Sequence, residues 1–190
     1  MIEQILQLVA RSQTILVASH ESPDGDAIGS TLALAIALRE MGKDVVAYNR
    51  DRAPLEYTFL PCYDTVVNER DESLTFDAGF VLDAGDLNRA GSWIRESCKT
   101  LVNIDHHPYS QDFGDIYYVD TQACATGVLI YRLLRDAGHC ISADVATCIY
   151  TAILSDTGSF RYSNANPEAF QVAGELVGVG VDPWSIASGL

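Results

Sequence analysis

Short apolar runs alternate with longer stretches of helical periodicity along the whole chain. Apolar runs predict strands at 14–20, 45–48, 76–83 and 100–104, with shorter ones at 65–67 and 116–119, the last at a sheet edge. Helical spacing predicts helices at 2–11, 27–41, 89–98, 124–137, 143–154 and 168–177, a short one at 53–60, and a last one opened by Asp182 and Pro183. This alternation predicts an α/β fold, a mostly parallel β-sheet with helices on both faces.

Acidic and imidazole side chains directly follow four of these apolar segments. The four polar stretches are His20 to Asp26, Asp83 to Asp86, Asp105-His106-His107, and Ser155-Asp156. Each stretch alone is more often a surface histidine, an Asx turn or a helix cap. Because the carboxyl ends of parallel strands meet at one edge of a sheet, we expect the four stretches to lie together. Four unrelated surface features would rarely gather at one edge by chance, so the combination favours a functional site.

The donor set of these stretches is rich in carboxylates and lacks a thiolate. Such a set suits Mn²⁺ or Mg²⁺, with Fe, Co or Zn as alternatives. Asp24 and Asp26 flank Gly25 on one tight loop, so their carboxylates can point in different directions and serve two ions. Two ions about 3.5–4 Å apart can activate a water and stabilise the leaving oxygen of a phosphate ester.

Composition narrows the class of protein. With 12 basic against 26 acidic residues, the formal net charge of −14 argues against binding of long nucleic acid, but a metal ion can offset this charge for a short phosphorylated substrate. The five cysteines contain no C-x-x-C pair, which indicates free thiols in a reducing compartment. There is no signal-peptide pattern and no apolar run long enough for a bilayer, so we expect a cytoplasmic protein without a membrane partner.

The combination of motifs resembles the DHH-superfamily phosphoesterases. The matching stretches are Ser19 to Ser30, Val81 to Asp86, Ile104 to His107 and Leu154 to Tyr162, in family order over almost the whole chain. The stretch from Asp156 to Asn164, and Asp83 followed by Arg89, look most like the nanoRNase and pAp phosphatase branch. The resemblance implies a hydrolase that cleaves phosphate esters of short oligonucleotides or of 3′-phosphoadenosine 5′-phosphate, with a metal-activated hydroxide as the nucleophile.

The resemblance also implies a role for each candidate residue. Two Mn²⁺ ions are expected, with Mg²⁺ or Co²⁺ as alternatives. His20 and Asp24 would bind the first ion, Asp26, His106 and Asp156 the second, and Asp83 would bridge both. Asp105 would orient His106. His107 would contact the phosphate or protonate the leaving oxygen, and Arg89 would contact the phosphate, although a solvated arginine explains Arg89 equally well.

One departure from the family bears on domain organisation. Relatives in this branch carry a second, smaller domain with a Gly-Gly-Gly-His motif, and no such motif occurs here. We therefore expect residues 1–190 to form the catalytic domain alone. Two other functions stay open, a manganese-dependent inorganic pyrophosphatase and a non-catalytic nucleotide-binding module, and a homodimer is one option for the assembly. Missing G-x-G-x-x-G and G-x-x-x-x-G-K motifs argue against a Rossmann dehydrogenase and a P-loop NTPase.

Overall fold

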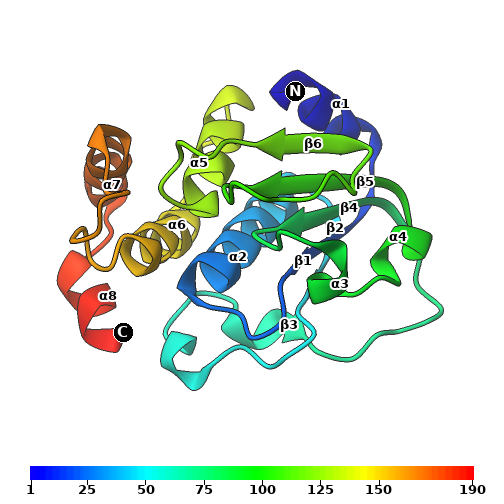
Figure 1. Cartoon of the computed structure of the whole chain (residues 1–190), viewed down its shortest axis with the longest axis horizontal. Coiled ribbons are helices and arrows are strands. Elements are labelled where there is room, and N and C mark those ends of the chain that lie inside the picture. The colour runs from blue at the N-terminus through cyan, green and yellow to red at the C-terminus, as the bar shows by residue number, and fades with distance from the viewer.

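A six-stranded sheet forms the centre of the molecule in the computed structural model, which describes residues 1–190 (Figure 1). Its strands are β1 (Thr14–Ser19), β2 (Asp44–Tyr48), β3 (Val66–Val67), β4 (Phe76–Leu82), β5 (Cys98–Asp105) and β6 (Ile116–Val119). Every neighbouring pair is parallel, and the order across the sheet is β3-β2-β1-β4-β5-β6. The predicted parallel sheet is confirmed, and β6 is an edge strand as expected.

The strand order changes direction between β1 and β4. From β1 the chain moves outward through β2 to β3, and it then returns to place β4 on the other side of β1. Ser19 pairs with Leu82, so these two neighbouring strands end at the same level. Loops that leave such a pair diverge and open a crevice at the carboxyl edge, where α/β sheets bind ligands. The residues that follow β1 and β4 are therefore brought together.

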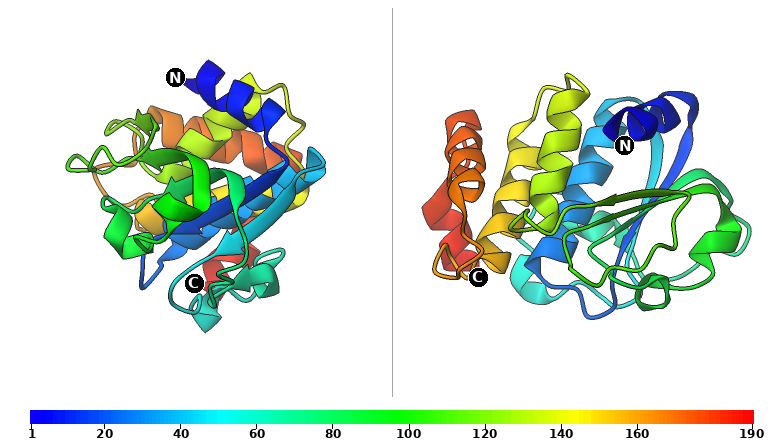
Figure 2. Two further views of the ribbon diagram at one scale, coloured as in Figure 1. Left: turned by 90° about the vertical axis from the view of Figure 1, so that its right-hand side faces the viewer. Right: turned by 45° about the horizontal axis from the view of Figure 1, so that its top comes forward.

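Long helices cover one face of the sheet. They are α1 (Ile2–Arg11), α2 (Gly25–Glu40) and α5 (Thr126–Asp136), and α6 (Ala143–Asp156) packs on α2. Two further helices, α7 (Pro167–Val179) and α8 (Pro183–Gly189), lie beyond α6 and farthest from the sheet (Figure 2). A Cβ atom at Gly29 of α2 would lie 2.6 Å from the carbonyl oxygen of Cys148, so this glycine permits the close approach of α6.

The opposite face is covered more thinly, and here the helix predictions need correction. The single helix expected at 89–98 is two short helices, α3 (Leu87–Ala90) and α4 (Ile94–Ser97). Gly91 separates them with φ at +128°, a conformation that favours glycine and ends the first helix. On the side of the long helices, where Ala53, Tyr57 and Leu60 join the larger core, the helix expected at 53–60 is reduced to one 3₁₀ turn, η1 (Leu55–Tyr57). A second turn, η2 (Tyr63–Thr65), follows it.

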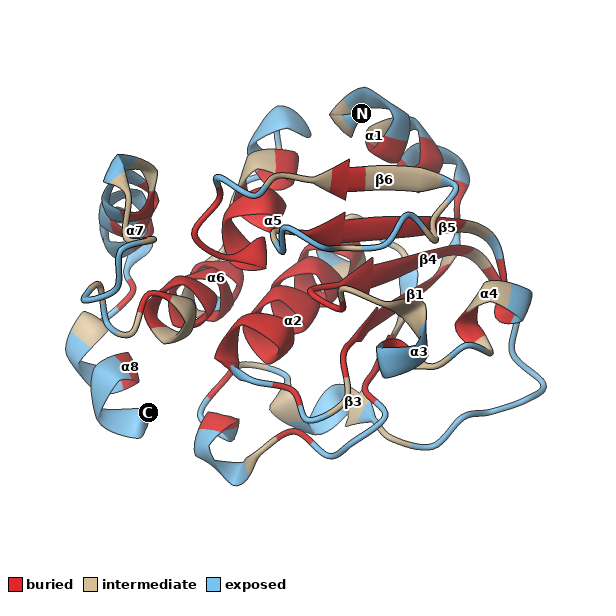
Figure 3. Ribbon diagram, viewed as in Figure 1, coloured by how far each residue is buried: buried red, intermediate tan, exposed pale blue.

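Burial follows this layered arrangement (Figure 3). The central strands and α2 are buried, and the exposed residues collect on the outer helices and loops. The larger apolar core, which includes Ile28 and Phe80, fills the space between the sheet and the long helices, and a smaller core around Leu16 and Ile94 lies on the other face. None of the helices combines the length and the apolar character that crossing a bilayer requires.

Candidate metal centre

The candidate ligands meet at the carboxyl edge of the sheet. His20 follows β1, Asp83 follows β4, and His106 follows β5. Asp24 is the N-cap of α2 and Asp26 lies in its first turn, because this helix begins two residues earlier than predicted. Asp156 is the last residue of α6. The close packing of α6 on α2 brings Asp156 to the same place as the strand ends, so the structure gathers all six predicted ligands.

The first group of side chains is formed by His20, Asp24 and Asp83. The Nε2 atom of His20 lies 3.6 Å from Oδ2 of Asp83 and 3.9 Å from Oδ1 of Asp24. The Nδ1 atom of the same ring lies 2.6 Å from the carbonyl oxygen of Glu21, which can only accept a hydrogen bond. Nδ1 therefore carries the proton of the neutral ring, and the lone pair of Nε2 faces the two carboxylates. This arrangement has the donor atoms of a metal site.

The second group is formed by Asp26, His106 and Asp156, together with the other oxygen of Asp83. His106 Nε2 lies 3.6 Å from Oδ2 of Asp26, from Oδ1 of Asp83 and from Oδ2 of Asp156. Its Nδ1 lies 3.3 Å from the carbonyl oxygen of Ala123. His106 Nε2 is buried and has no hydrogen-bond partner. A buried lone pair and three carboxylate oxygens that face one another form the donor set of a metal site, so the residues present fit a divalent ion.

Asp83 is common to both groups. One of its oxygens faces His20 and the other faces His106. Its backbone has φ at +56°, a left-handed conformation that costs an aspartate about 1–2 kcal/mol. Such strain is typical of functional sites, where the surrounding structure enforces it. Asp83 therefore offers one carboxylate oxygen to each of the two groups.

The electrostatics of the site also favour the binding of a cation. Burial raises the pKa of Asp26 well above its ordinary value, and the charges of Asp83 and Asp156 raise it further. Burial likewise raises the pKa of Asp156, and the charges of Asp83 and Asp24 add to the effect. Carboxylates crowded in this way retain protons unless a cation neutralises them. A bound divalent ion would remove this penalty.

The amino end of α5 supports Asp26, a feature that the sequence reasoning missed. The backbone N–H groups of Thr126 and Gly127 donate to the two oxygens of Asp26 at 2.6 and 3.0 Å, and the hydroxyl of Ser30 donates at 2.8 Å. The Thr126 hydroxyl donates to Asp83 at 3.0 Å. No side chain of its own segment caps α5, so Asp26 caps it from another element. The sequence signal for this contact was Ala125 at the N-cap position, because alanine cannot cap the helix and a partner from elsewhere is then needed.

Asp105 holds His107 rather than the ring of His106, which differs from our expectation. The carboxylate of Asp105 accepts hydrogen bonds from the backbone N–H groups of both histidines, and one of its oxygens lies 2.8 Å from Nδ1 of His107. The chain turns at this point, so that only the His107 ring folds back to Asp105. The hydrogen bond to Asp105 raises the pKa of His107 to about 9 in spite of partial burial, and charges such as that of Asp83 add to it.

The same hydrogen bonds act on Asp105. Burial opposes ionisation of its carboxyl group, but the hydrogen bonds from His107 and Ser110 outweigh burial and lower the pKa to about 2.

Arg89 lies on α3, exposed, and its guanidinium donates to the carbonyl oxygen of Ala84 at 3.0 Å. Arg89 is therefore held against the loop that follows Asp83, with no carboxylate partner.

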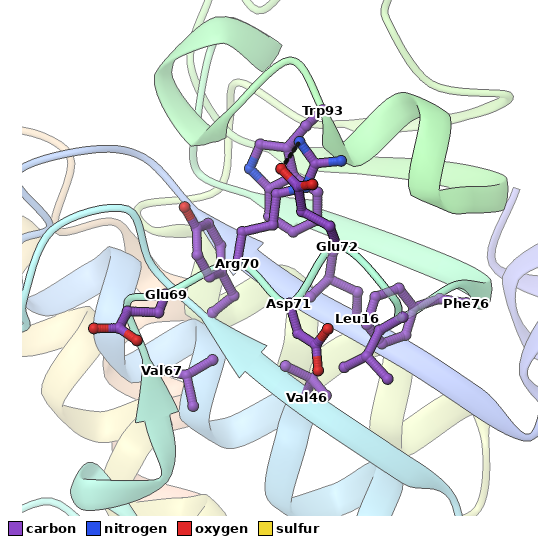
Figure 4. A pocket seen from close by; sticks show the side chains of 11 residues that line it. Leu16, Val46, Val67, Glu69, Arg70, Asp71, Glu72, Phe76 and Trp93 are labelled. Carbon is purple, nitrogen blue, oxygen red and sulfur yellow. Dashed lines mark ion pairs between the residues drawn. The ribbon is translucent and has the colours of Figure 1, made fainter.

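A cavity lies away from these residues, lined by side chains such as Leu16, Val46 and Phe76 (Figure 4). It has a volume of about 530 Å³ and lies on the opposite face of the sheet from α2, beside Tyr48 and Trp93. Its rim carries the carboxylates of Glu69, Asp71 and Glu72, while the guanidinium of Arg70 lies 5.0 Å from the centre of the Trp93 ring. An acidic rim is unfavourable for a phosphorylated ligand, so we do not assign the substrate to this cavity.

The chain is similar to known proteins over most of its length. The chain is 38% identical over 170 residues to the bifunctional oligoribonuclease and PAP phosphatase NrnA of Thermus thermophilus, an alignment that covers 88% of this chain and 50% of that protein. It is 30% identical over 175 residues to a probable manganese-dependent inorganic pyrophosphatase of Exiguobacterium, over 89% of this chain and 56% of that protein.

A solved structure shows the same fold. The exopolyphosphatase-related protein of Bacteroides fragilis superposes with a TM-score of 0.94 at 30% identity, and the superposition covers 99% of this chain and 59% of that one. The chain spans about half the length of the curated relatives it matches. The family model described as the N-terminal domain of the DHH family matches residues 14–153. This chain therefore belongs to the DHH family.

Proposed function

We propose that this chain is the metal-binding catalytic domain of a phosphoesterase that hydrolyses short oligonucleotides or 3′-phosphoadenosine 5′-phosphate. The observation that carries the proposal is the buried Nε2 atom of His106, which faces oxygens of three carboxylates at 3.6 Å and has no hydrogen-bond partner. The name of the Thermus thermophilus relative, an oligoribonuclease and PAP phosphatase, supports the choice of substrates. The Asp-rich donor set favours two Mn²⁺ ions over Zn²⁺.

Each side chain has a defined task in this proposal. His20, Asp24 and Asp83 would hold one ion, and Asp26, His106, Asp156 and Asp83 would hold the other. Two divalent ions supply an activated water at neutral pH and neutralise charge on the phosphate. Asp105 fixes the His107 ring by the bond to Nδ1 and keeps it protonated at neutral pH, which leaves its Nε2–H free to donate a proton to the leaving oxygen.

The test begins with metal-free protein resupplied with Mn²⁺, Mg²⁺ or Co²⁺. Phosphate and nucleotide release are then measured from 3′-phosphoadenosine 5′-phosphate, a dinucleotide and pyrophosphate. We expect hydrolysis of the first two substrates with Mn²⁺ and its loss in Asp83→Ala, while Asp64→Asn, an exposed carboxylate away from the site, serves as the control. Metal analysis should give two ions per chain, and Asp24→Ala and Asp156→Ala should each lose one.

A manganese-dependent inorganic pyrophosphatase is the second candidate, because the Exiguobacterium relative carries that name at 30% identity. The same assay separates the two, since a pyrophosphatase would hydrolyse pyrophosphate in preference to either nucleotide. Hydrolysis of none of the three substrates by a chain with two ions bound would contradict both enzymatic proposals and favour a nucleotide-binding module. Full activity in Asp83→Ala would refute the assignment of the metal centre.

A further inference from the structure

The exposed tyrosine rings lie on two segments that directly follow candidate site residues in the sequence. The chain has nine tyrosines, and just two of them are exposed, Tyr109 and Tyr162. Tyr109 is 92% exposed and follows His107 by two residues, and Tyr162 is 62% exposed and follows Asp156 by six residues. Neither ring packs on another aromatic side chain. Both exposed rings are therefore carried by segments that also supply candidate site residues.

The loop that carries Tyr109 is fixed although the ring itself is bare. The backbone N–H of Gln111 donates to the carbonyl oxygen of Gly85 at 2.8 Å. The side-chain amide of Asn103, in the buried part of β5, donates to the hydroxyl of Ser110 at 3.1 Å. An aromatic ring that a fixed loop presents to solvent loses little conformational entropy when a ligand stacks on it. Tyr109 is thus suited to contact a flat ligand.

The segment after Asp156 is bent so that it presents Arg161 and Tyr162. Gly158, Ser159 and Phe160 have consecutive φ angles of +54°, +59° and +62°, which turn the chain back on itself. Arg161 Nε donates to the carbonyl oxygen of Gly158 at 2.7 Å. A Cβ atom on Gly158 would lie 2.3 Å from Cζ of Tyr162, so the Tyr162 ring lies directly on this turn. Both side chains are therefore held against the backbone that follows Asp156.

Arg161 and Arg89 are both anchored beside candidate ligands. Neither guanidinium has a carboxylate within 4.0 Å, in contrast to Arg132, which binds two carboxylates. Each donates instead to a backbone carbonyl just after a candidate ligand, Arg89 to Ala84 and Arg161 to Gly158. An arginine held in place without a counter-ion is ready to pair with an anion, and phosphate is the anion that best matches its fork of donors.

We propose that Arg161, Tyr109 and Tyr162 form a substrate-holding rim around the metal centre. Arg161 pairs with a phosphate group other than the one that is cleaved, and the rings of Tyr109 and Tyr162 provide stacking surfaces for a nucleobase. This inference rests on the proposed phosphoesterase function and narrows it. The substrates it selects are nucleotides with both a base and a second phosphate group, namely nucleoside bisphosphates and 5′-phosphorylated dinucleotides.

The test measures binding with probes that cannot be hydrolysed. One probe is an analogue of 3′-phosphoadenosine 5′-phosphate with methylene groups in place of both ester oxygens, and the base-free probe is methylenediphosphonate. Dissociation constants are measured by isothermal titration calorimetry with Mn²⁺ present. Arg161→Gln should weaken binding of the nucleotide probe about tenfold or more, the range expected for a lost charge-assisted contact.

The tyrosine variants separate stacking from general damage to the site. Tyr109→Ala should raise the dissociation constant of the nucleotide probe about tenfold relative to that of methylenediphosphonate. Tyr109→Phe should keep the wild-type ratio of the two dissociation constants, because its ring still stacks. Tyr162→Ala should raise the same ratio. The matched controls are Arg11→Gln, on α1 at the amino edge of the sheet, and Trp184→Ala, an exposed aromatic on α8, and both should change binding less than twofold.

Phosphate release by the wild-type chain is measured separately, so the two proposals can fail independently. If the wild type releases phosphate but Arg161→Gln and Tyr109→Ala bind the nucleotide probe normally, the rim is refuted and the phosphoesterase stands. If there is no release but both variants weaken binding, the rim stands as a nucleotide-binding surface and the phosphoesterase is refuted. Controls that weaken binding as much as the rim variants also refute the rim.

Discussion

Asp156→Asn should stabilise the metal-free protein, even though it removes a candidate ligand. Carboxylate oxygens of Asp26 and Asp156 lie within 4.8 Å of each other around His106. Two full charges at that distance repel by roughly 3 kcal/mol at an effective dielectric constant of 20. The raised pKa values of both groups show that protons relieve part of this cost. We therefore expect the substitution to increase the free energy of unfolding in EDTA by about 1–2 kcal/mol.

The same reasoning fixes the sign of the pH dependence in EDTA. The pKa values of Asp26 and Asp156 are higher in the folded protein than the ordinary aspartate value. The folded protein therefore binds more protons than the unfolded chain between the ordinary value and the raised ones. The contribution of these two groups to stability falls as the pH rises through that window, and Asp156→Asn should flatten the decline.

In Mn²⁺, we expect the wild type to be more stable than Asp156→Asn, the reverse of the order expected in EDTA. An ion at a concentration of 100 times its dissociation constant stabilises the folded state by about 2.7 kcal/mol, and the variant, which has lost one ligand, should gain less. Thermal unfolding in EDTA and in Mn²⁺ provides the assay, with about 2–4 °C expected per kcal/mol for a chain of this size. Asp64→Asn is the control for the loss of one charge. A variant that is less stable than wild type in EDTA, or that gains as much from Mn²⁺, would refute the reasoning.

Two further substitutions test the packing and the hydrogen bonding that position the site. Gly29→Val should lower the free energy of unfolding, measured in urea, by about 1–3 kcal/mol, because its Cβ would lie 2.6 Å from the Cys148 carbonyl oxygen. Gly174→Ala, with open space around it, should not lower this free energy. Equal effects of the two substitutions would argue against tight packing of α6 on α2. Asp105→Asn should lower the pKa of His107 from about 9 toward 6.5 in an NMR titration without metal, and an unchanged pKa would contradict the assigned hydrogen bond.

The polar ends of apolar segments made the main features of the site predictable from the sequence. Buried parallel strands need continuous apolar runs, so the residues that end each run are placed at one edge of the sheet. That argument places His20, Asp83 and His106 at one edge from the sequence alone. The resemblance to a known family then divided the ligands between two ions, and the distances around His20 and His106 are compatible with that division.

Contacts between distant segments were not predictable in this way. The hydrogen bonds from the amino end of α5 to Asp26 depend on how two helices pack, which periodicity within either segment does not encode. The pairing of Asp105 with the His107 ring depends on a turn that decides which of two adjacent rings folds back. The break between α3 and α4, in contrast, was predictable, because Gly91 lies inside the short helix predicted at 89–98 and a glycine there indicates a helix end.

The bond between Thr126 and Asp26 joins residues 100 positions apart, and this separation has a consequence for folding. The candidate centre draws on residues from His20 to Asp156, so no short fragment of the chain contains it. Such high contact order means that the centre forms only when the sheet and the packing of α6 are complete. Ion binding would therefore report on global folding rather than on any local unit. During synthesis, the complete candidate centre would exist only after Asp156 had left the ribosome.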